Sequence, residues 1–300
     1  MRAYGLRRQL WRVRRNLPRA VAQPLSAVLP PFSAPDKPIF LIGCPRSGTS
    51  VLLRALLAGG ELKSIQSEGH ILWDAYHHPR NRDWESDSLG SADVVERERE
   101  YIYAAVRLVV GGHRFVDKTP ENCLRIPYLN ALFPDATFVF LHRHAADNVN
   151  SLMEGWRARL RFVRHRLPEP LQGIAPLDGN LWSFVLVPGW RDMRMAPLEE
   201  ICAQQYVACN EAALAARDKL PPERWIDCAY EDLVASPVDM LGALYERLGL
   251  ELTHRTERRV TEVLERPGPT ALTAPEPDKW RRQNEASVER IESRWKAAMT

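Results

Sequence analysis

The 300-residue sequence lacks the features that mark membrane-spanning, secreted or zinc-stabilised proteins. It has no run of about 18 uncharged apolar residues, which excludes an ordinary transmembrane helix. Its N-terminus has no apolar stretch of roughly 7–15 residues of the secretory type. The five cysteines form no Cys-x-x-Cys pair, which argues against a disulfide framework or a structural zinc site. We therefore expect a soluble protein of the reducing cytoplasm with no bound metal.

Acidic residues are absent from the first 35 positions, which carry seven arginines. Residues 36–300 hold 34 basic and 38 acidic residues and so carry a net charge of −4. The overall charge of +3 is the sum of this value and the +7 of the first 35 residues. A body this acidic argues against a dedicated nucleic-acid binder. The sequence predicts two regions: a basic arm with a proline-rich linker over 1–36, and a folded region over 37–300.

The basic arm also has an apolar face. Leu6, Leu10, Val13 and Leu17 recur at helical spacing, and arginines fill many of the other positions. A basic amphipathic helix suits peripheral contact with an anionic membrane surface, or an acidic partner. A solvated, partly disordered extension would have the same composition. The sequence leaves both interpretations open.

From residue 38 onward, short apolar runs alternate with helical patterns, which predicts an α/β fold with a parallel sheet flanked by helices. The expected strands are 38–42, 114–117, 137–141 and 224–228. The expected helices are 48–58, 121–133, 197–220, 237–248, 255–265 and 284–299. Such sheets bind ligands at the carboxyl ends of their strands.

The segment 156–194 interrupts this alternation. It contains three of the nine tryptophans, several arginines and four prolines, and it is too long for a simple connection. We expect a helical or loop insertion, which acts either as a lid that lines a pocket with its tryptophans and arginines or as a packed surface excursion.

The most informative motif is Gly43-Cys44-Pro45-Arg46-Ser47-Gly48-Thr49-Ser50, between an expected strand and an expected helix. Its frame, Gly-x-x-x-x-Gly-x-Ser, matches the nucleotide-binding P-loop except that Thr49 occupies the lysine position. A helix N-terminus presents unpaired N–H groups to an anion. Arg46 supplies the missing positive charge with a fork suited to phosphate or sulfate oxygens. The loop is therefore expected to bind a smaller anionic group than a triphosphate.

A second basic element follows the expected strand 137–141. Arg143 lies at the carboxyl end of this strand, beside the expected ligand crevice. Ser151 comes eight residues later, about two turns into the next helix, where its hydroxyl can reach the same anion. On its own, Arg143 is equally consistent with an ordinary salt bridge.

Taken together, these motifs resemble the sulfotransferases that use 3′-phosphoadenosine 5′-phosphosulfate (PAPS), most closely the bacterial and tyrosylprotein branches. In chain order they are PRSGTS at 45–50, DKTP at 117–120, FPDATF at 133–138, Arg143 with Ser151, YEDLVASP at 230–237 and DKWR at 278–281. The first loop differs from the usual family pattern at Ser50, where threonine is common, but keeps the hydroxyl. The blocks extend over about 38–300, so the resemblance implies a single sulfotransferase domain of P-loop-like fold, with 156–194 as its insertion.

The resemblance also implies which residues hold the cofactor. Arg46, Ser47, Gly48, Thr49 and Ser50 would cradle the 5′-phosphosulfate, Arg143 and Ser151 the 3′-phosphate, and Tyr230 and Lys279 would make further cofactor contacts. PAPS would act as a co-substrate and leave as adenosine 3′,5′-bisphosphate.

Sulfuryl transfer requires a base for the acceptor proton and a cation near the bridging oxygen. Glu68 falls where the tyrosylprotein branch keeps its catalytic glutamate, and His70 competes because the cytosolic branch uses histidine. The spacing favours Glu68. Lys118 matches the family lysine near the transferred group and, with Arg46, is expected to stabilise the transition state. The resemblance thus implies in-line transfer of the sulfuryl group to a hydroxyl or amine. Because the sequence shows no signal anchor and no lumenal cysteine pattern, we expect a small-molecule, glycan or lipid acceptor.

Two other functions explain part of the pattern. A P-loop kinase using ATP would account for the loop, but not for Thr49 or for the Arg143–Ser151 pair. A non-catalytic nucleotide-binding module on the same fold would not need Glu68 or Lys118. No sequence feature identifies the acceptor or the oligomeric state.

Overall fold

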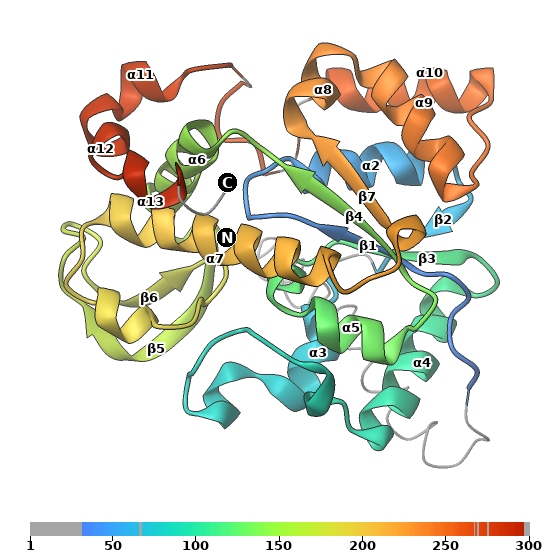
Figure 1. Ribbon diagram of the computed structural model, residues 1–300, viewed down its shortest axis with the longest axis horizontal. Helices are drawn as coiled ribbons and strands as arrows, with labels where there is room; N and C mark the ends of the chain where they lie inside the picture. The colour runs from blue at the N-terminus through green and yellow to red at the C-terminus, as the bar shows by residue number, and fades with distance from the viewer. Residues whose placement is uncertain (1–31, 66–67, 267, 269, 275, 297–300) are drawn as a thin grey trace, which may run out of the picture.

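The computed structural model describes residues 32–65, 68–266, 268, 270–274 and 276–296 (Figure 1). The helix predicted in the basic arm lies outside this range, so its membrane contact stays a prediction. The described part is an α/β structure in which helices flank a central sheet and a small hairpin lies to one side (Figure 1). Among the described helices, none is both long and apolar enough to cross a lipid bilayer.

The central sheet has five parallel strands in the order β2-β3-β1-β4-β7. Their bounds are β1 Ile39–Ile42, β2 Leu62–Lys63, β3 Arg114–Asp117, β4 Thr137–His142 and β7 Trp225–Ala229. The sequence predicted all of these except β2, which has too few residues to form an apolar run. Because β1 pairs with both β3 and β4, the loop that follows β1 emerges at the middle of the sheet.

Helices cover both faces of the sheet, and three short C-terminal helices pack on α6 and α7 (Figure 1). Their bounds are α2 Thr49–Ala58, α3 His70–His77, α4 Glu96–Val110, α5 Ile126–Leu132, α6 Ala145–Arg157, α7 Leu198–Arg217, α8 Tyr230–Ala235, α9 Pro237–Leu248, α10 His254–Glu265, α11 Trp280–Gln283, α12 Glu285–Arg290 and α13 Glu292–Lys296. The single helix expected over 284–299 was wrong in its described part, because Ile291 interrupts it between α12 and α13. Ile291 is buried, and its N–H donates to the carbonyl of Val288, three residues earlier, in place of the α-helical partner four residues earlier.

The sheet separates two hydrophobic cores because side chains alternate along each strand. Ile39 and Leu41 of β1 pack with α2, α9 and α10. Phe40 packs on the opposite side, where its ring lies against Phe133 and Phe138 with centroids 5.4 and 5.7 Å away. Burial on both faces explains why these strands are continuous apolar runs in the sequence.

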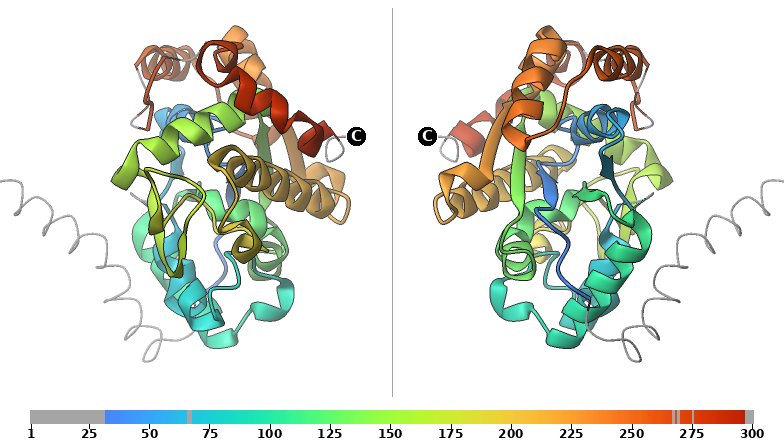
Figure 2. Two further views of the ribbon diagram at one scale, coloured as in Figure 1. Left: turned by 90° about the vertical axis from the view of Figure 1, so that its left-hand side faces the viewer. Right: turned by 90° about the vertical axis from the view of Figure 1, so that its right-hand side faces the viewer.

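The insertion 156–194 folds into an antiparallel hairpin, β5 Val163–Leu171 and β6 Gly179–Ser183, rather than a plain loop. Its tryptophans pack on one another, with Trp182 5.3 Å from Trp156 and 6.1 Å from Trp190 between ring centroids. The prediction that they line a pocket was therefore wrong, because they form the core of the insertion. Figure 2 shows the hairpin beside the segment around α3, which it contacts through the rings of His165 and His78.

Candidate active site

A cavity of 1350 Å³ lies at the carboxyl ends of the parallel strands. Four neighbouring strands each supply a lining element directly after their last residue. The phosphate loop begins at Gly43 after β1, Lys118 follows β3, Arg143 follows β4 and Tyr230 follows β7. The parallel register thus brings together groups that lie far apart in the sequence.

The loop after β1 has the backbone geometry of an anion-binding turn. Arg46 and Gly48 both have positive φ, 73° and 100°, and α2 begins at Thr49. The first turn of a helix leaves N–H groups without an intrahelical partner, so those of Thr49 and Ser50 are available to a ligand. Gly48 is required here because an added Cβ would lie 2.5 Å from the ring of Tyr230. The loop and Tyr230 are therefore in close contact.

Arg46 is fixed from several directions. Its Nε donates to the hydroxyl of Ser151 at 3.1 Å and its Nη1 to the carbonyl of Thr270 at 2.7 Å. Its guanidinium carbon also lies 5.0 Å from the centroid of the Phe162 ring. Ser151, which the sequence paired with Arg143, thus contacts Arg46. Helix α6 supports the loop again where Asn148 donates to the carbonyl of Pro45 at 2.9 Å.

Arg143 lies against the same loop. Its Nη1 donates to the Arg46 carbonyl at 3.1 Å, and its guanidinium carbon lies 4.4 Å from the centroid of the Tyr230 ring. Burial, followed by the charge of Arg143, lowers the pKa of Arg46 to about 10. Within the described residues, neither arginine forms a salt bridge with a carboxylate. The charges of Glu154 and Asp147 act on Arg46 and Arg143 across the cavity, and a bound anion would offset the repulsion between the two arginines further.

Glu68, His70 and Lys118 meet on the wall below the loop. Lys118 Nζ donates to Glu68 Oε1 at 2.5 Å, and His70 Nδ1 lies 3.9 Å from Glu68 Oε2. The Lys118 side chain is 9% exposed and that of Glu68 36%, so the carboxylate reaches the cavity while the ammonium group is largely enclosed. The two base candidates therefore lie beside each other, and one of them, Glu68, contacts Lys118.

Asp117, the last residue of β3, holds this wall together. Its carboxylate accepts from the Gly69 N–H at 3.1 Å and from Asn122 Nδ2 at 2.7 Å. The Gly69 N–H also donates to the Thr119 hydroxyl at 2.6 Å. These bonds join the segment that carries Glu68 to the turn that carries Lys118. Complete burial raises the pKa of Asp117 to about 6.

Lys279 enters the cavity from the C-terminal segment. Its Nζ donates to Glu154 Oε1 at 3.1 Å and to the hydroxyl of Thr273. Every residue that the sequence assigned to the site lines the cavity except Ser47. The Ser47 side chain is fully buried and its N–H donates to the Cys44 carbonyl at 3.1 Å, so Ser47 shapes the turn from within.

Sequence reasoning missed several lining residues. Phe162 and Phe184, with ring centroids 5.1 Å apart, come from the insertion, and Thr270 comes from the C-terminal segment. No local pattern points to these residues, because only tertiary folding brings them to the cavity. Glu154 could have been found, since it follows Ser151 by three residues and hence shares its helix face.

One group in the described part of the chain has the spacing of a metal site. Single ligand atoms of Asp87, Glu121 and His165 lie within 4.8 Å of one another, and all three residues are buried. Arg125 and Arg164 already pair with these carboxylates. Because a divalent cation would be repelled by both arginines, we interpret the group as an internal ionic network.

The fold and cavity together define an α/β protein with a cavity at the carboxyl ends of a parallel sheet, lined by arginines and by the start of a helix. The chain belongs to the sulfotransferase family, whose sequence profile matches residues 38–254. This match confirms the resemblance drawn from the ordered motifs.

Two curated relatives match part of the chain. The nodulation protein NoeE of Sinorhizobium fredii is 28% identical over 145 residues, which is 43% of this chain and 33% of that protein. A putative protein-tyrosine sulfotransferase of Caenorhabditis briggsae is 26% identical over 129 residues, 39% of this chain and 42% of that protein. The matched regions thus span less than half the length of these relatives.

Solved structures share the fold over most of the chain. Sulfotransferase STF9 from Mycobacterium avium has a TM-score of 0.57 at 17% identity, covering 91% of this chain and 79% of that one. Mouse sulfotransferase SULT7A1, complexed with PAP, has a TM-score of 0.51 at 12% identity, covering 92% and 86%. At these identities the likeness concerns the fold alone.

Proposed function

We propose that the protein transfers a sulfuryl group from PAPS to a hydroxyl or amine of a small-molecule or lipid acceptor. The acceptor atom forms a bond to sulfur while the bond from sulfur to the bridging phosphate oxygen breaks. The acceptor proton passes to a carboxylate base, and adenosine 3′,5′-bisphosphate leaves.

The observation that carries the proposal is the pair Arg46 and Arg143. Both guanidiniums are packed around one loop, and the Nε of Arg143 is buried without a hydrogen-bond partner among the described residues. A buried N–H group without a hydrogen-bond partner costs free energy unless a ligand accepts from it. Arginine forks match phosphate and sulfate oxygens, so these two arginines fit a nucleotide with two anionic groups, such as PAPS.

Each part of the donor set is given a role under this proposal. The N–H groups of Thr49 and Ser50, together with Arg46, bind the 5′-phosphosulfate. Arg143 and Ser151 bind the 3′-phosphate. Tyr230 contacts the nucleotide next to the loop glycine, and Lys279 exchanges its contact with Glu154 for a phosphate oxygen.

Glu68 is the proposed base, and His70 lies beside it. Lys118 donates to Oε1 of Glu68, which fixes the direction in which the carboxylate faces. Once PAPS is bound, Lys118 interacts both with Glu68 and with the bridging phosphate oxygen, on which negative charge develops as its bond to sulfur breaks. The exposed side of Glu68 is the side that an acceptor hydroxyl would approach.

Ligand-dependent stabilisation tests the cofactor. We expect adenosine 3′,5′-bisphosphate to raise the melting temperature, and ATP with magnesium to raise it less, since binding shifts stability by mass action. A rise with ATP and magnesium alone would overturn the proposal in favour of a kinase.

Transfer of ³⁵S from labelled PAPS into a small-molecule extract tests the reaction. Labelled organic products support it. Binding of adenosine 3′,5′-bisphosphate without any transfer from PAPS would favour a non-catalytic binding module.

A further inference from the structure

A buried ionic network lies behind the wall that carries Glu68 and Lys118. It contains three carboxylates, two arginines and a histidine: Asp74, Asp87, Glu121, Arg125, Arg164 and His165. No role in sulfuryl transfer has been given to any of these residues above. Arg164 and Glu121 nevertheless reach the cavity surface, which places the network in contact with the site.

Arg164 joins three separate parts of the chain. It lies near the start of β5 in the insertion, and its guanidinium binds Asp74 of α3 through Nη2 and Glu121 through Nε. Its side chain is 17% exposed, and the side chains of Asp74 and Glu121 are 12% and 2% exposed. A planar fork can hold two carboxylates in fixed directions, which an ammonium group cannot do.

Both partners of Arg164 lie close in sequence to proposed catalytic groups. Asp74 follows His70 by four residues on α3, so the two share one helix face, and Glu68 precedes the helix by two residues. Glu121 lies three residues after Lys118, in the short helix Pro120–Leu124. The Arg164 bridge therefore connects the two segments whose spacing fixes the contact between Glu68 and Lys118.

The bridge is an ion pair. Burial alone raises the pKa of Glu121, but the charge of Arg164 and then that of His70 outweigh burial and hold the pKa well below its ordinary range. Glu121 is therefore ionised at neutral pH when it contacts Arg164.

We propose that Arg164 is a positioning residue for sulfuryl transfer, through which the insertion sets the distance between Glu68 and Lys118. The inference rests on the proposed function. It does not require Arg164 to touch the acceptor, because the bridge acts through α3 and the turn after β3.

The test uses Arg164→Lys and Asp74→Asn in the full chain, with transfer of ³⁵S from PAPS to the extract acceptors. Arg164→Lys keeps the charge but loses the fork. Asp74→Asn weakens the same bridge at a residue that does not line the cavity. We expect both to lower kcat by roughly 10- to 100-fold, the effect of a misplacement of about 1 Å. The KM for PAPS and the affinity for adenosine 3′,5′-bisphosphate should stay unchanged.

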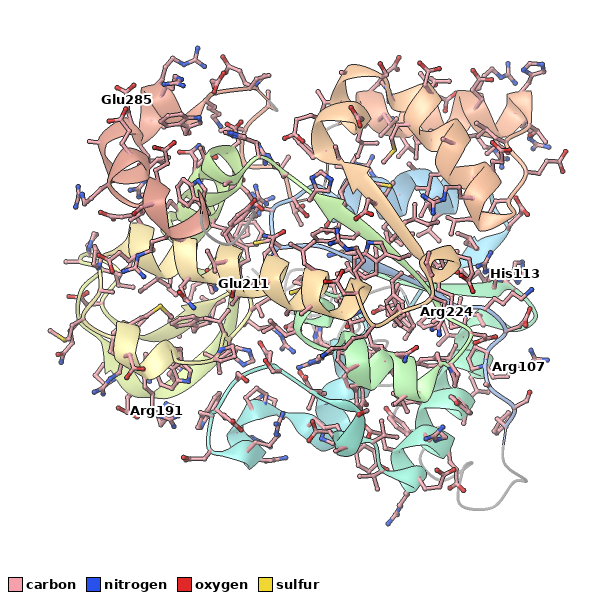
Figure 3. All side chains as sticks on the ribbon, in the orientation of Figure 1. Arg107, His113, Arg191, Glu211, Arg224 and Glu285 are labelled. Carbon is pink, nitrogen blue, oxygen red and sulfur yellow. The ribbon has the colours of Figure 1, made fainter. Side chains whose placement is uncertain are left out.

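Arg191→Lys is the matched control. Arg191 belongs to the same insertion and pairs with Glu169 at 3.0 Å, and Figure 3 places it at the outer edge of the molecule. This variant should keep wild-type kcat. The double variant of Arg164 and Asp74 should be no slower than the worse single variant, because both changes break one bridge.

Three results would overturn the proposal that Arg164 positions Glu68 and Lys118. The proposal is overturned if Asp74→Asn keeps wild-type kcat, since Arg164 would then act only on the acceptor, or if the losses in the double variant simply add. Should Arg164→Lys fail to fold, Asp74→Asn carries the test. If the wild type binds adenosine 3′,5′-bisphosphate but transfers nothing, the proposed function itself fails, and this role with it.

Discussion

Gly48→Ala should disturb the anion site through the ring of Tyr230. The backbone at Gly48 has a φ of 100°, a conformation that costs an L-residue about 1–2 kcal/mol. The new Cβ would also lie 2.5 Å and 2.8 Å from two carbons of the Tyr230 ring. The ring must then move away from Gly48, which disturbs its contact with the guanidinium of Arg143.

The backbone strain and the clash with Tyr230 give the expected losses of unfolding free energy and of nucleotide affinity. Overpacking of this kind typically costs about 1–3 kcal/mol, so strain and clash together should lower the free energy of unfolding by about 2–5 kcal/mol. Loss of the cation–π contact, about 0.5–2 kcal/mol, should weaken binding of adenosine 3′,5′-bisphosphate by roughly 2- to 30-fold. Urea unfolding and calorimetric titration measure the two effects separately.

Gly60→Ala is the matched control for strain. Gly60 has a φ of 88°, and no atom lies within 4 Å of its added Cβ. This variant should lose about 1–2 kcal/mol of unfolding free energy and bind the nucleotide normally. If Gly48→Ala binds as tightly as Gly60→Ala, then contact between the loop and Tyr230 does not organise the anion site, and the reasoning is refuted.

Three further predictions follow from the site. Glu68→Gln should lower kcat by about 10²–10⁴-fold while binding adenosine 3′,5′-bisphosphate normally, because it loses only the base; full turnover in a ³⁵S transfer assay would remove Glu68 from that role. Arg143→Ala should weaken binding of adenosine 3′,5′-bisphosphate by roughly 10- to 100-fold, from about 1.5–3 kcal/mol for a charged hydrogen bond. Calorimetry should show little change for adenosine 5′-phosphate, and an equal loss for both nucleotides would contradict a contact to the 3′-phosphate. Asp117→Asn tests a titration: burial raises the pKa of Asp117 to about 6, so between about pH 4 and 6 the folded state keeps a proton that the unfolded chain has released. The contribution of this carboxyl to unfolding free energy therefore falls as pH rises through 6, and the stability of the variant relative to the wild type should increase from pH 4 to 7. A pH-independent difference in urea unfolding would show that Asp117 titrates normally.

The parts of the fold that the sequence predicts are those fixed by local patterns. The strands β1, β3 and β4 are almost wholly buried, so their apolar residues are visible in the sequence without knowledge of their neighbours, and the edge strand β7 differs only in its exposed Asp227 and half-buried Ala229. Helix α9 begins at a proline and ends before Gly249, whose φ of 65° terminates it, and its predicted bounds are the observed ones. Helices α3 and α4 escaped prediction, as did β2.

The phosphate loop is a local signal too, since its glycines, arginine and helix start are contiguous. The contacts between opposite walls of the cavity have no such local signal, because the residues that form them lie far apart in the sequence. The contact between Lys118 and Glu68 spans 50 residues, and that between Arg46 and Thr270 spans 224. Such pairs follow from the register of the sheet and the path of the insertion. A single sequence therefore identifies the residue types but not their pairing.

The hairpin β5–β6 has a consequence for how this protein can diverge. The anion-binding loop comes from the sheet, whereas Phe162 and Phe184 on the facing wall come from the insertion, which joins the rest of the chain between α6 and α7. Grafting another hairpin between those helices would exchange one wall and, for the loop, remove only the contact of Phe162 with Arg46. A graft that also omitted Arg164 would leave Asp74 and Glu121 facing each other without their shared cation. Under the proposed function, we therefore expect a change of acceptor to be best tolerated when the new hairpin keeps an arginine at the second position of its first strand.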